Sequence, residues 1–145
     1  MPSAAFTFRP AAESDFPYIL DLSIRTMREH LERIGRYDPD RRRTRMRAHL
    51  DAGSLHLIGR DGAKIGCVGL KPRGEAVELH SFFLEPALQG RGLGAAVFAA
   101  LRARHPGAWW IEVLKQSPAR PFWERQGFVL TGEQPFDWIM ERAAD

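Results

Sequence analysis

The chain has 145 residues, of which 44% are hydrophobic and 27% charged, and its net charge is +3. These values are typical of a soluble globular protein and exclude a disordered chain, and the length fits one domain over residues 1–145. No apolar run approaches the roughly 18 residues of a membrane span, and no secretory signal is visible, so we expect a cytoplasmic protein. The single cysteine, Cys67, excludes an internal disulfide and a cysteine-based zinc site.

The first third of the chain predicts a short strand and two helices. Residues 6–9 alternate between apolar and polar types, as a strand does. A helix capped by Ser14 or Asp15 is expected to continue to Gly35, because apolar residues recur along one face of it at steps of three and four. These residues are Leu20, Ile24, Met27, Leu31 and Ile34. A second, more polar helix is expected to end near Gly53.

Arginine dominates this part of the chain. Between Arg25 and Arg47 there are nine arginines and four acidic residues. One interpretation is a basic surface that meets an acidic ligand or nucleic acid, and the other is a solvated helix face. Because no aromatic residue that could stack on a base lies within the run from Arg41 to Arg47, we favour the solvated face.

The remainder of the chain predicts short strands separated by two helices. The expected elements are a hairpin of residues 55–60 and 64–71, a strand at 76–84, a helix at 92–105, a strand at 109–114, a short helix at 119–126 and strands at 128–131 and 138–141. Strict alternation would place Glu78, His80, Phe82 and Leu84 on one side of their strand. The order of elements indicates a mixed α+β fold rather than repeated βαβ units.

A glycine-rich segment, Gln89-Gly90-Arg91-Gly92-Leu93-Gly94, lies between a predicted strand and a predicted helix. Glycines have no Cβ atom, so a diphosphate can approach the backbone N–H groups closely. The helix N-terminus and the charge of Arg91 add to the attraction. We therefore expect an anion-binding loop.

The same loop also satisfies a dinucleotide-binding pattern. Gly90, Gly92 and Ala95 fit G-x-G-x-x-A, and Glu112 follows at about the distance of a ribose-binding acid. A dinucleotide fold, however, needs its first glycine at the end of the strand, and here residues 85–88 intervene. It also needs βαβ units, which this chain lacks, so we set this interpretation aside.

Two blocks of the sequence resemble the GCN5-related N-acetyltransferase family. The segment from Leu84 to Gly94 resembles the family's acyl-CoA-binding signature, Q/R-x-x-G-x-G/A. The segment from Val113 to Phe128 is similar to a second block, V-x-x-x-N-x-x-A-x-x-F-Y-E-R-x-G-F. The resemblance extends from Phe6 to Arg142. It implies a three-layer fold with a central mixed, mostly antiparallel sheet flanked by helices, in which a splayed strand pair binds acyl-CoA.

The resemblance also implies how acetyl-CoA would bind as a cosubstrate. The strand would pair with the pantetheine arm, the glycine loop would hold the pyrophosphate, and the backbone N–H of Leu84 would stabilise the oxyanion. The implied binding residues are Phe82, Phe83, Leu84, Gln89, Gly90, Arg91, Gly92, Leu93, Gly94, Ala95, Gln116 and Trp123. An amine would attack the thioester directly in a ternary complex. No metal is expected, because the histidines show no paired spacing.

Two positions depart from the family pattern. Gln116 replaces a frequent asparagine, and Trp123 replaces a tyrosine that often protonates the departing thiolate. An indole N–H can donate a hydrogen bond, but it cannot release a proton near neutral pH. Either solvent protonates the thiolate, or the thiolate leaves unprotonated.

The reaction also needs a base, because an amine is protonated at pH 7. Glu78 occupies the strand position where some family members carry a catalytic glutamate, and His80 titrates near neutrality. We expect Glu78 to be the principal base, acting through a water molecule, with His80 as the alternative. Either residue could instead be an ordinary hydrogen-bonded strand residue.

The sequence therefore predicts an acetyl-CoA-dependent N-acetyltransferase that acts on a primary amine of a small molecule or peptide, as a monomer or homodimer. The alternative is a non-catalytic acyl-CoA-binding module, which Trp123 keeps open. A nucleic-acid binder, which we do not favour, would show salt-dependent affinity and indifference to CoA. If the run from Arg41 to Arg47 lines the acceptor site, Arg42 and Arg43 are expected to select amines that carry a carboxylate or phosphate.

Overall fold

The computed structural model describes residues 6–145 and contains a seven-stranded sheet in the order β1-β2-β3-β4-β5-β7-β6. The strands are β1 (Phe6–Pro10), β2 (Leu55–Arg60), β3 (Ala63–Arg73), β4 (Ala76–Leu84), β5 (Trp109–Leu114), β6 (Val129–Glu133) and β7 (Asp137–Arg142). The helices are α1 (Phe16–Arg33), α2 (Pro39–Asp51), α3 (Leu93–Arg104) and α4 (Arg120–Arg125), with short 3-10 turns η1 (Glu13–Asp15) and η2 (Pro86–Leu88). The predicted order of strands and helices is confirmed.

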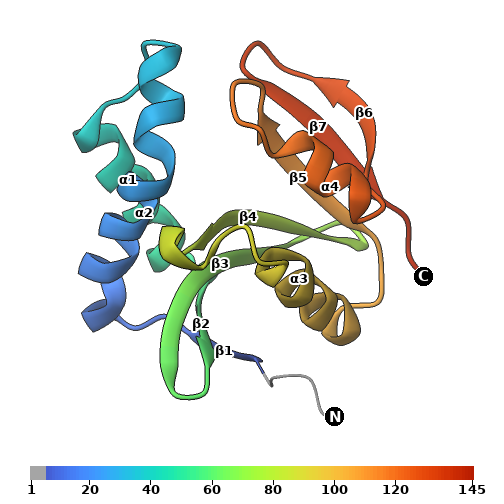
Figure 1. Ribbon diagram of the computed structural model, residues 1–145, viewed down its shortest axis with the longest axis horizontal. Helices are drawn as coiled ribbons and strands as arrows, with labels where there is room; N and C mark the ends of the chain where they lie inside the picture. The colour runs from blue at the N-terminus through green and yellow to red at the C-terminus, as the bar shows by residue number, and fades with distance from the viewer. Residues whose placement is uncertain (1–5) are drawn as a thin grey trace.

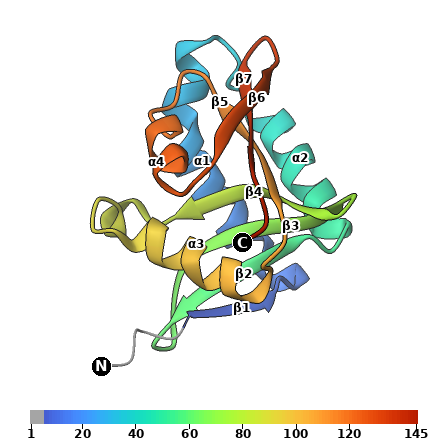
Figure 2. The same ribbon diagram turned by 90° about the vertical axis from the view of Figure 1, so that its right-hand side faces the viewer.

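The helices cover the two faces of the sheet in pairs, α1 and α2 on one face and α3 and α4 on the other (Figures 1 and 2). Under α3, the core contains Val97, Phe98 and Leu101, and under α1 it contains Ile19 and Leu22. Burial of these apolar faces supplies most of the driving force for folding. Among residues 6–145, no helix combines the length and the apolar character needed to cross a membrane.

The parallel pair β4–β5 is very short. Val77 pairs with Trp109 and Glu78 with Trp110, and the two strands then diverge. Figure 1 shows β5 and β7 rising away from β4 on one side, while α1 rises on the other. Among residues 6–145, no strand pairs with the β5-side edge of β4 beyond Glu78. The expected mixed, mostly antiparallel sheet with a splayed strand pair is confirmed.

A bulge at Ser81 reverses the alternation of side chains along β4. The register between β3 and β4 shifts at this point, and Ser81 has a φ of +49°. Glu78 and His80 consequently lie on the α2 side of the sheet, whereas Phe82 and Leu84 pack in the core under α3. The prediction that these four side chains share one side is therefore wrong, because a bulge adds one residue to the strand.

Candidate active site

A cavity of about 450 Å³ lies between the two N-terminal helices and the diverging strands β4, β5 and β7. Most of the charged and titratable side chains on its wall come from α2, β4 and the β5–β7 pair. They include Arg42, Arg45, His49, Glu78, Glu112 and Asp137. Concave, mixed polar surfaces of this kind are the usual location of small-molecule sites.

Helix α1 supplies an apolar part of the wall through Met27 and Leu31. These residues belong to the predicted apolar stripe, but they are only half-buried because they face the cavity. The side chains that α1 buries completely, Ile19 and Leu22, lie on a neighbouring face. The 3.6-residue period of apolar residues thus predicted the helix correctly. The apolar stripe, however, lies at the edge of the cavity rather than in the centre of the core.

Two contacts connect the end of α1 to the opposite side of the cavity. Arg33 donates a hydrogen bond of 3.1 Å to the backbone carbonyl of Gln116, and the guanidinium of Arg36 lies 4.5 Å from the ring centre of Phe136. Gln116 itself is exposed. The predicted contact of its side chain with pantetheine stays a prediction.

The glycine loop follows β4 through η2 and leads directly into α3. Gly90 and Gly92 have φ values of +81° and +75°, a conformation that favours glycine, and Gly92 is the N-cap of α3. A Cβ atom at either position would meet nothing within 4 Å, so open space adjoins the helix N-terminus. The Gln89 side chain donates to the carbonyl of Leu84 at 3.0 Å and ties the loop to the end of β4.

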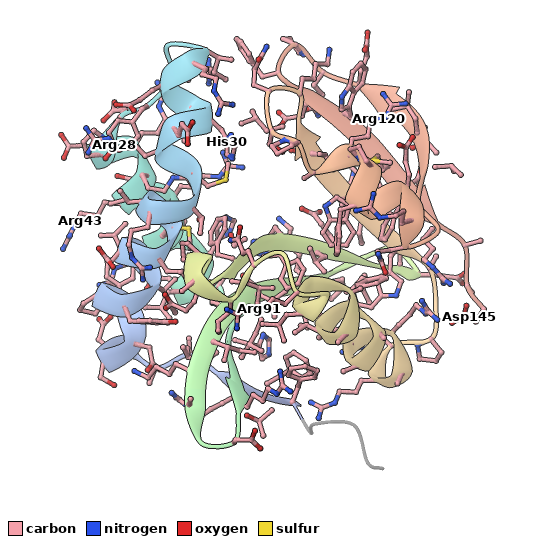
Figure 3. The ribbon with its side chains drawn as sticks, in the orientation of Figure 1. Arg28, His30, Arg43, Arg91, Arg120 and Asp145 are labelled. Atoms are coloured by element: carbon pink, nitrogen blue, oxygen red, sulfur yellow. The ribbon has the colours of Figure 1, made fainter. Side chains whose placement is uncertain are left out.

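Arg91 projects from the loop, as Figure 3 shows. With Arg60 and Lys64 it lines a second cavity, of about 670 Å³, between the loop and the β2–β3 hairpin. The structure therefore does not bring the glycine loop and Glu78 into the same cavity. The unpaired edge of β4 runs between them.

The backbone of Leu84 faces this unpaired edge. The N–H of Glu85 donates to the carbonyl of Ile65 on β3 at 2.9 Å, and successive residues of a strand direct their N–H groups to opposite edges. The N–H of Leu84 is therefore directed away from β3, toward the side of β5. An N–H in this position can bind the carbonyl oxygen of a thioester laid along β4.

Trp123 borders the first cavity but is otherwise packed among aromatic rings. Its ring centre lies 5.7 Å from that of Phe82 and 5.5 Å from that of Phe98. Both tyrosines of the chain are occupied elsewhere: Tyr18 donates a hydrogen bond of 2.5 Å to Glu85, and Tyr37 lies under the guanidinium of Arg28. Neither lines the cavity in the described part of the chain.

Glu78 is held by two cations. One carboxylate oxygen lies 3.2 Å from Arg73 Nη1, and the other lies 3.6 Å from Lys71 Nζ. The side chain is only 13% exposed, and Arg73 is fixed in turn by stacking on the ring of Trp110 at 3.6 Å. These partners restrict the freedom of Glu78 to take a proton from a substrate.

His80 lies against Gly69 and stacks on His49. The two imidazole centres are 4.1 Å apart, and a Cβ atom at residue 69 would collide with the His80 ring, so the ring requires glycine there. Burial, followed by the nearby positive charges, lowers the pKa of His80 to about 3 and that of His49 to about 4. Both rings are therefore neutral at pH 7, and a role of His80 as the base stays a prediction.

Glu112 on β5 faces the cavity, and the sequence interpretation considered it only as a ribose-binding acid. Within residues 6–145 its carboxylate has no ion-pair partner. Glu112 is exposed on the open side of the cavity, and partial desolvation, reinforced by Asp137 and Glu78, raises its pKa. In sequence, Glu112 is the only charged residue of the otherwise apolar strand β5. This was the available signal for a functional carboxylate.

The neutral histidine pair predicts a loss of stability in acid. Both folded-state pKa values lie below the ordinary 6.5, so the unfolded chain binds more protons, and stability falls as the pH drops below about 6.5. From about pH 7.5 to 5.5 the loss is up to about 1.4 kcal/mol per histidine, and less for the half-exposed His49. Urea unfolding at both pH values measures it. A His49→Gln/His80→Gln variant should flatten the slope, and an unchanged slope would contradict the account.

Comparisons with known proteins identify the family and the fold. Residues 17–128 match the model of the family described as the acetyltransferase (GNAT) family. An acetyltransferase structure from Thermus thermophilus superposes with a TM-score of 0.75 at 18% identity, covering 99% of each chain. The PaiA N-acetyltransferase of Thermoplasma acidophilum, solved with coenzyme A, gives 0.73 at 15% identity and covers 96% of this chain and 99% of that one.

A larger enzyme also contains the fold. N-acetylglutamate synthase from Neisseria gonorrhoeae, complexed with coenzyme A and N-acetyl-glutamate, gives a TM-score of 0.71 at 17% identity. The alignment covers 99% of this chain but only 36% of the synthase. At such identities these likenesses show the fold alone. No curated protein sequence matches the chain.

Proposed function

The chain belongs to the acetyltransferase (GNAT) family, and from this premise we propose that it transfers an acetyl group from acetyl-CoA to a primary amine. The observation that carries the proposal is the free edge of β4, which runs from the glycine loop to the charged cavity. A pantetheine arm can pair with that edge as an added strand. The coenzyme A bound by the Thermoplasma relative supports the same class of cosubstrate.

In the proposed complex, the pyrophosphate lies on the loop from Gln89 to Ala95, where the backbone N–H groups and the N-terminus of α3 attract it. The pantetheine passes along Phe82 and Phe83, and Leu93 and Gly94 form the first turn of α3 at the end of the loop. The absence of a side chain at Gly94 lets α3 pack closely on Phe122, because a Cβ atom at this position would lie 3.2 Å from the Phe122 ring. The thioester then ends beside the cavity.

In the chemical step, the amine nitrogen attacks the thioester carbon. The N–H of Leu84 stabilises the negative charge that develops on the carbonyl oxygen. As the tetrahedral intermediate collapses, the C–S bond breaks and the C–N bond stays. The base takes one proton from the ammonium group before the attack, and the nitrogen releases a second proton to solvent as the intermediate collapses. CoA leaves as a thiolate, which solvent protonates because no tyrosine of the described chain borders the cavity.

The base is the carboxylate whose position and pKa suit the task. Glu78, the sequence prediction, is engaged by Lys71 and Arg73. Glu112 has a raised pKa and no such partner in the described chain, and a base is most effective when its pKa approaches the working pH. Because Glu78 pairs with Trp110, Glu112 lies two residues, or roughly 7 Å, further along the strands toward Leu84. We therefore favour Glu112, with Glu78 helping to raise its pKa.

Trp123 is expected to contribute packing rather than acid catalysis. Replacing it with phenylalanine should lower kcat by less than about tenfold, because only part of the aromatic cluster and one possible hydrogen bond are lost. Steady-state assays of CoA thiol release measure the effect. A fall of a hundredfold or more, in a folded variant with unchanged affinity for CoA, would instead assign the indole a role at the sulfur.

The experiment that tests the function compares three outcomes. Calorimetric titration with acetyl-CoA should give binding, and addition of a mixture of primary amines should then release free thiol. Binding without thiol release for any amine would support the non-catalytic acyl-CoA-binding module. Salt-dependent binding of duplex DNA with no response to CoA would support the nucleic-acid binder and contradict the proposal.

A further inference from the structure

The arginines of α2 point in two different directions. Arg43 extends away from the molecule on the outer side of the helix (Figure 3), and Arg47 forms an ion pair of 2.6 Å with Glu13. Arg42 and Arg45, by contrast, line the cavity between α2 and the splayed strands. The arginine-rich segment is therefore a solvated face on one side and a cavity wall on the other.

The two cavity arginines have no partner within residues 6–145: their side chains form no ion pair and donate no hydrogen bond in the described chain. The other cations of the cavity are engaged, since Lys71 pairs with Glu78 and Arg36 stacks on Phe136. Arg42 is the more buried of the pair, and burial, followed by repulsion from Arg45, lowers its pKa to about 10. Arg45 is exposed and Arg42 is half-buried, so the pair presents two guanidinium groups to an anion that enters the cavity.

The opposite wall carries negative charge. Glu112 and Asp137 project from β5 and β7, and partial desolvation raises the pKa of each carboxyl group. The charge of Arg45 partly offsets the rise in the pKa of both carboxyl groups. No ion pair within 4.0 Å, however, joins the two walls in the described chain. The cavity thus separates an arginine pair from a carboxylate pair, with space between them for a molecule that carries both charges.

We propose that the acceptor is a small primary amine that also bears a carboxylate or phosphate, with the anionic group bound by Arg42 and Arg45 and the amine directed to Glu112. This inference rests on the proposed function, whose acceptor it specifies. Guanidinium groups bind carboxylate and phosphate through paired hydrogen bonds, which fixes the orientation of the ligand as well as its charge. The arrangement replaces the predicted Arg42–Arg43 pair with Arg42 and Arg45, because residues 42 and 45 are one helical turn apart.

The test uses matched amines that differ only in the anionic group. The pairs are 4-aminobutyrate with 4-aminobutyramide, and 2-aminoethyl phosphate with ethanolamine. At least one anionic amine should show a kcat/KM at least about tenfold above that of its neutral counterpart, which corresponds to about 1.4 kcal/mol. Equal kcat/KM values within both pairs, or higher values for the neutral amines, would overturn the proposal.

Variants then assign the effect to residues. Arg42→Gln and Arg45→Gln should each raise KM for the anionic amine about tenfold or more, while KM for the neutral amine and the affinity for CoA change less than about twofold. Arg41→Gln, on the same helix but outside the cavity, is the matched control and should behave as the parent protein. If Arg42→Gln and Arg45→Gln showed the same KM for the anionic amine as Arg41→Gln, the assignment to Arg42 and Arg45 would be overturned.

A binding measurement separates this inference from the proposed function. Calorimetry with 4-aminobutyrate and 2-aminoethyl phosphate, in the presence of CoA, does not depend on turnover. Binding that Arg42→Gln abolishes, with no acetyl transfer to any amine, would contradict the transferase activity and support the anion site. Acetyl transfer to neutral amines, with no binding of either anionic amine, would support the activity and overturn the anion site.

Discussion

Replacing Gly92 with valine is expected to weaken CoA binding at least about a hundredfold in a protein that still folds. Gly92 is the N-cap of α3 with a φ of +75°, and open space surrounds its Cβ position. In the proposed complex the pyrophosphate occupies that space, so a branched side chain displaces it from the N–H groups of the loop. Losing two charge-assisted hydrogen bonds, at about 1.5–3 kcal/mol each, accounts for an effect of that size.

The control for this prediction is Gly53→Val. Gly53 has nearly the same φ, +74°, and also has nothing within 4 Å of a Cβ position, but it follows α2 rather than the loop. The two substitutions therefore impose similar backbone strain, and only one of them blocks the proposed cradle. Calorimetry with CoA should show unchanged affinity for Gly53→Val. Equal affinities for both variants would show that the pyrophosphate lies elsewhere.

Replacing Glu112 with glutamine is expected to lower kcat by about 10²–10⁴ while leaving the affinity for acetyl-CoA unchanged. Glutamine keeps the size of the side chain but cannot accept the proton of the amine. The raised pKa of Glu112 also predicts the direction of the pH effect: activity should rise with pH as this carboxyl ionises, and the variant should lose that acidic limb. Thiol-release rates across the pH range measure both quantities.

Three comparison variants distinguish the possible bases. Glu141→Gln, on β7 and outside the cavity, should be neutral. Glu78→Gln should lower kcat less than Glu112→Gln, because it removes only a neighbouring charge and two ion pairs. If Glu78→Gln were the more damaging change, the base would be Glu78, as the sequence resemblance implied. If only His80→Ala lowered kcat, the base would instead be His80.

Local patterns in the sequence predicted most of the fold. Apolar periodicity and turn residues located every strand and helix to within a few residues, because each depends on neighbours in the chain. The glycine loop was equally visible, since Gly90 and Gly92 adopt the positive φ that their residue type favours.

The site was harder to predict because it depends on contacts between distant segments. The bulge at Ser81 has no clear sequence signal, since serine rarely adopts a φ of +49°, yet it decides which side chains of β4 face the cavity. The importance of Glu112 depends on Asp137 and Glu78, which come from two other strands. Helical spacing places Arg42 and Arg45 on one side of α2, but only the packing of α2 against the sheet shows that this side faces the cavity.

The most direct test of the account is to follow the acetyl group itself. The protein is incubated with acetyl-CoA deuterated in the acetyl methyl group and with 4-aminobutyrate, 2-aminoethyl phosphate and their neutral counterparts, and the amines are analysed by mass spectrometry. The account predicts that deuterated acetyl appears on an amine nitrogen in an amount equal to the CoA released, and that Glu112→Gln suppresses both. Binding of acetyl-CoA without any labelled amine, and with thiol release no faster than spontaneous hydrolysis, would contradict it.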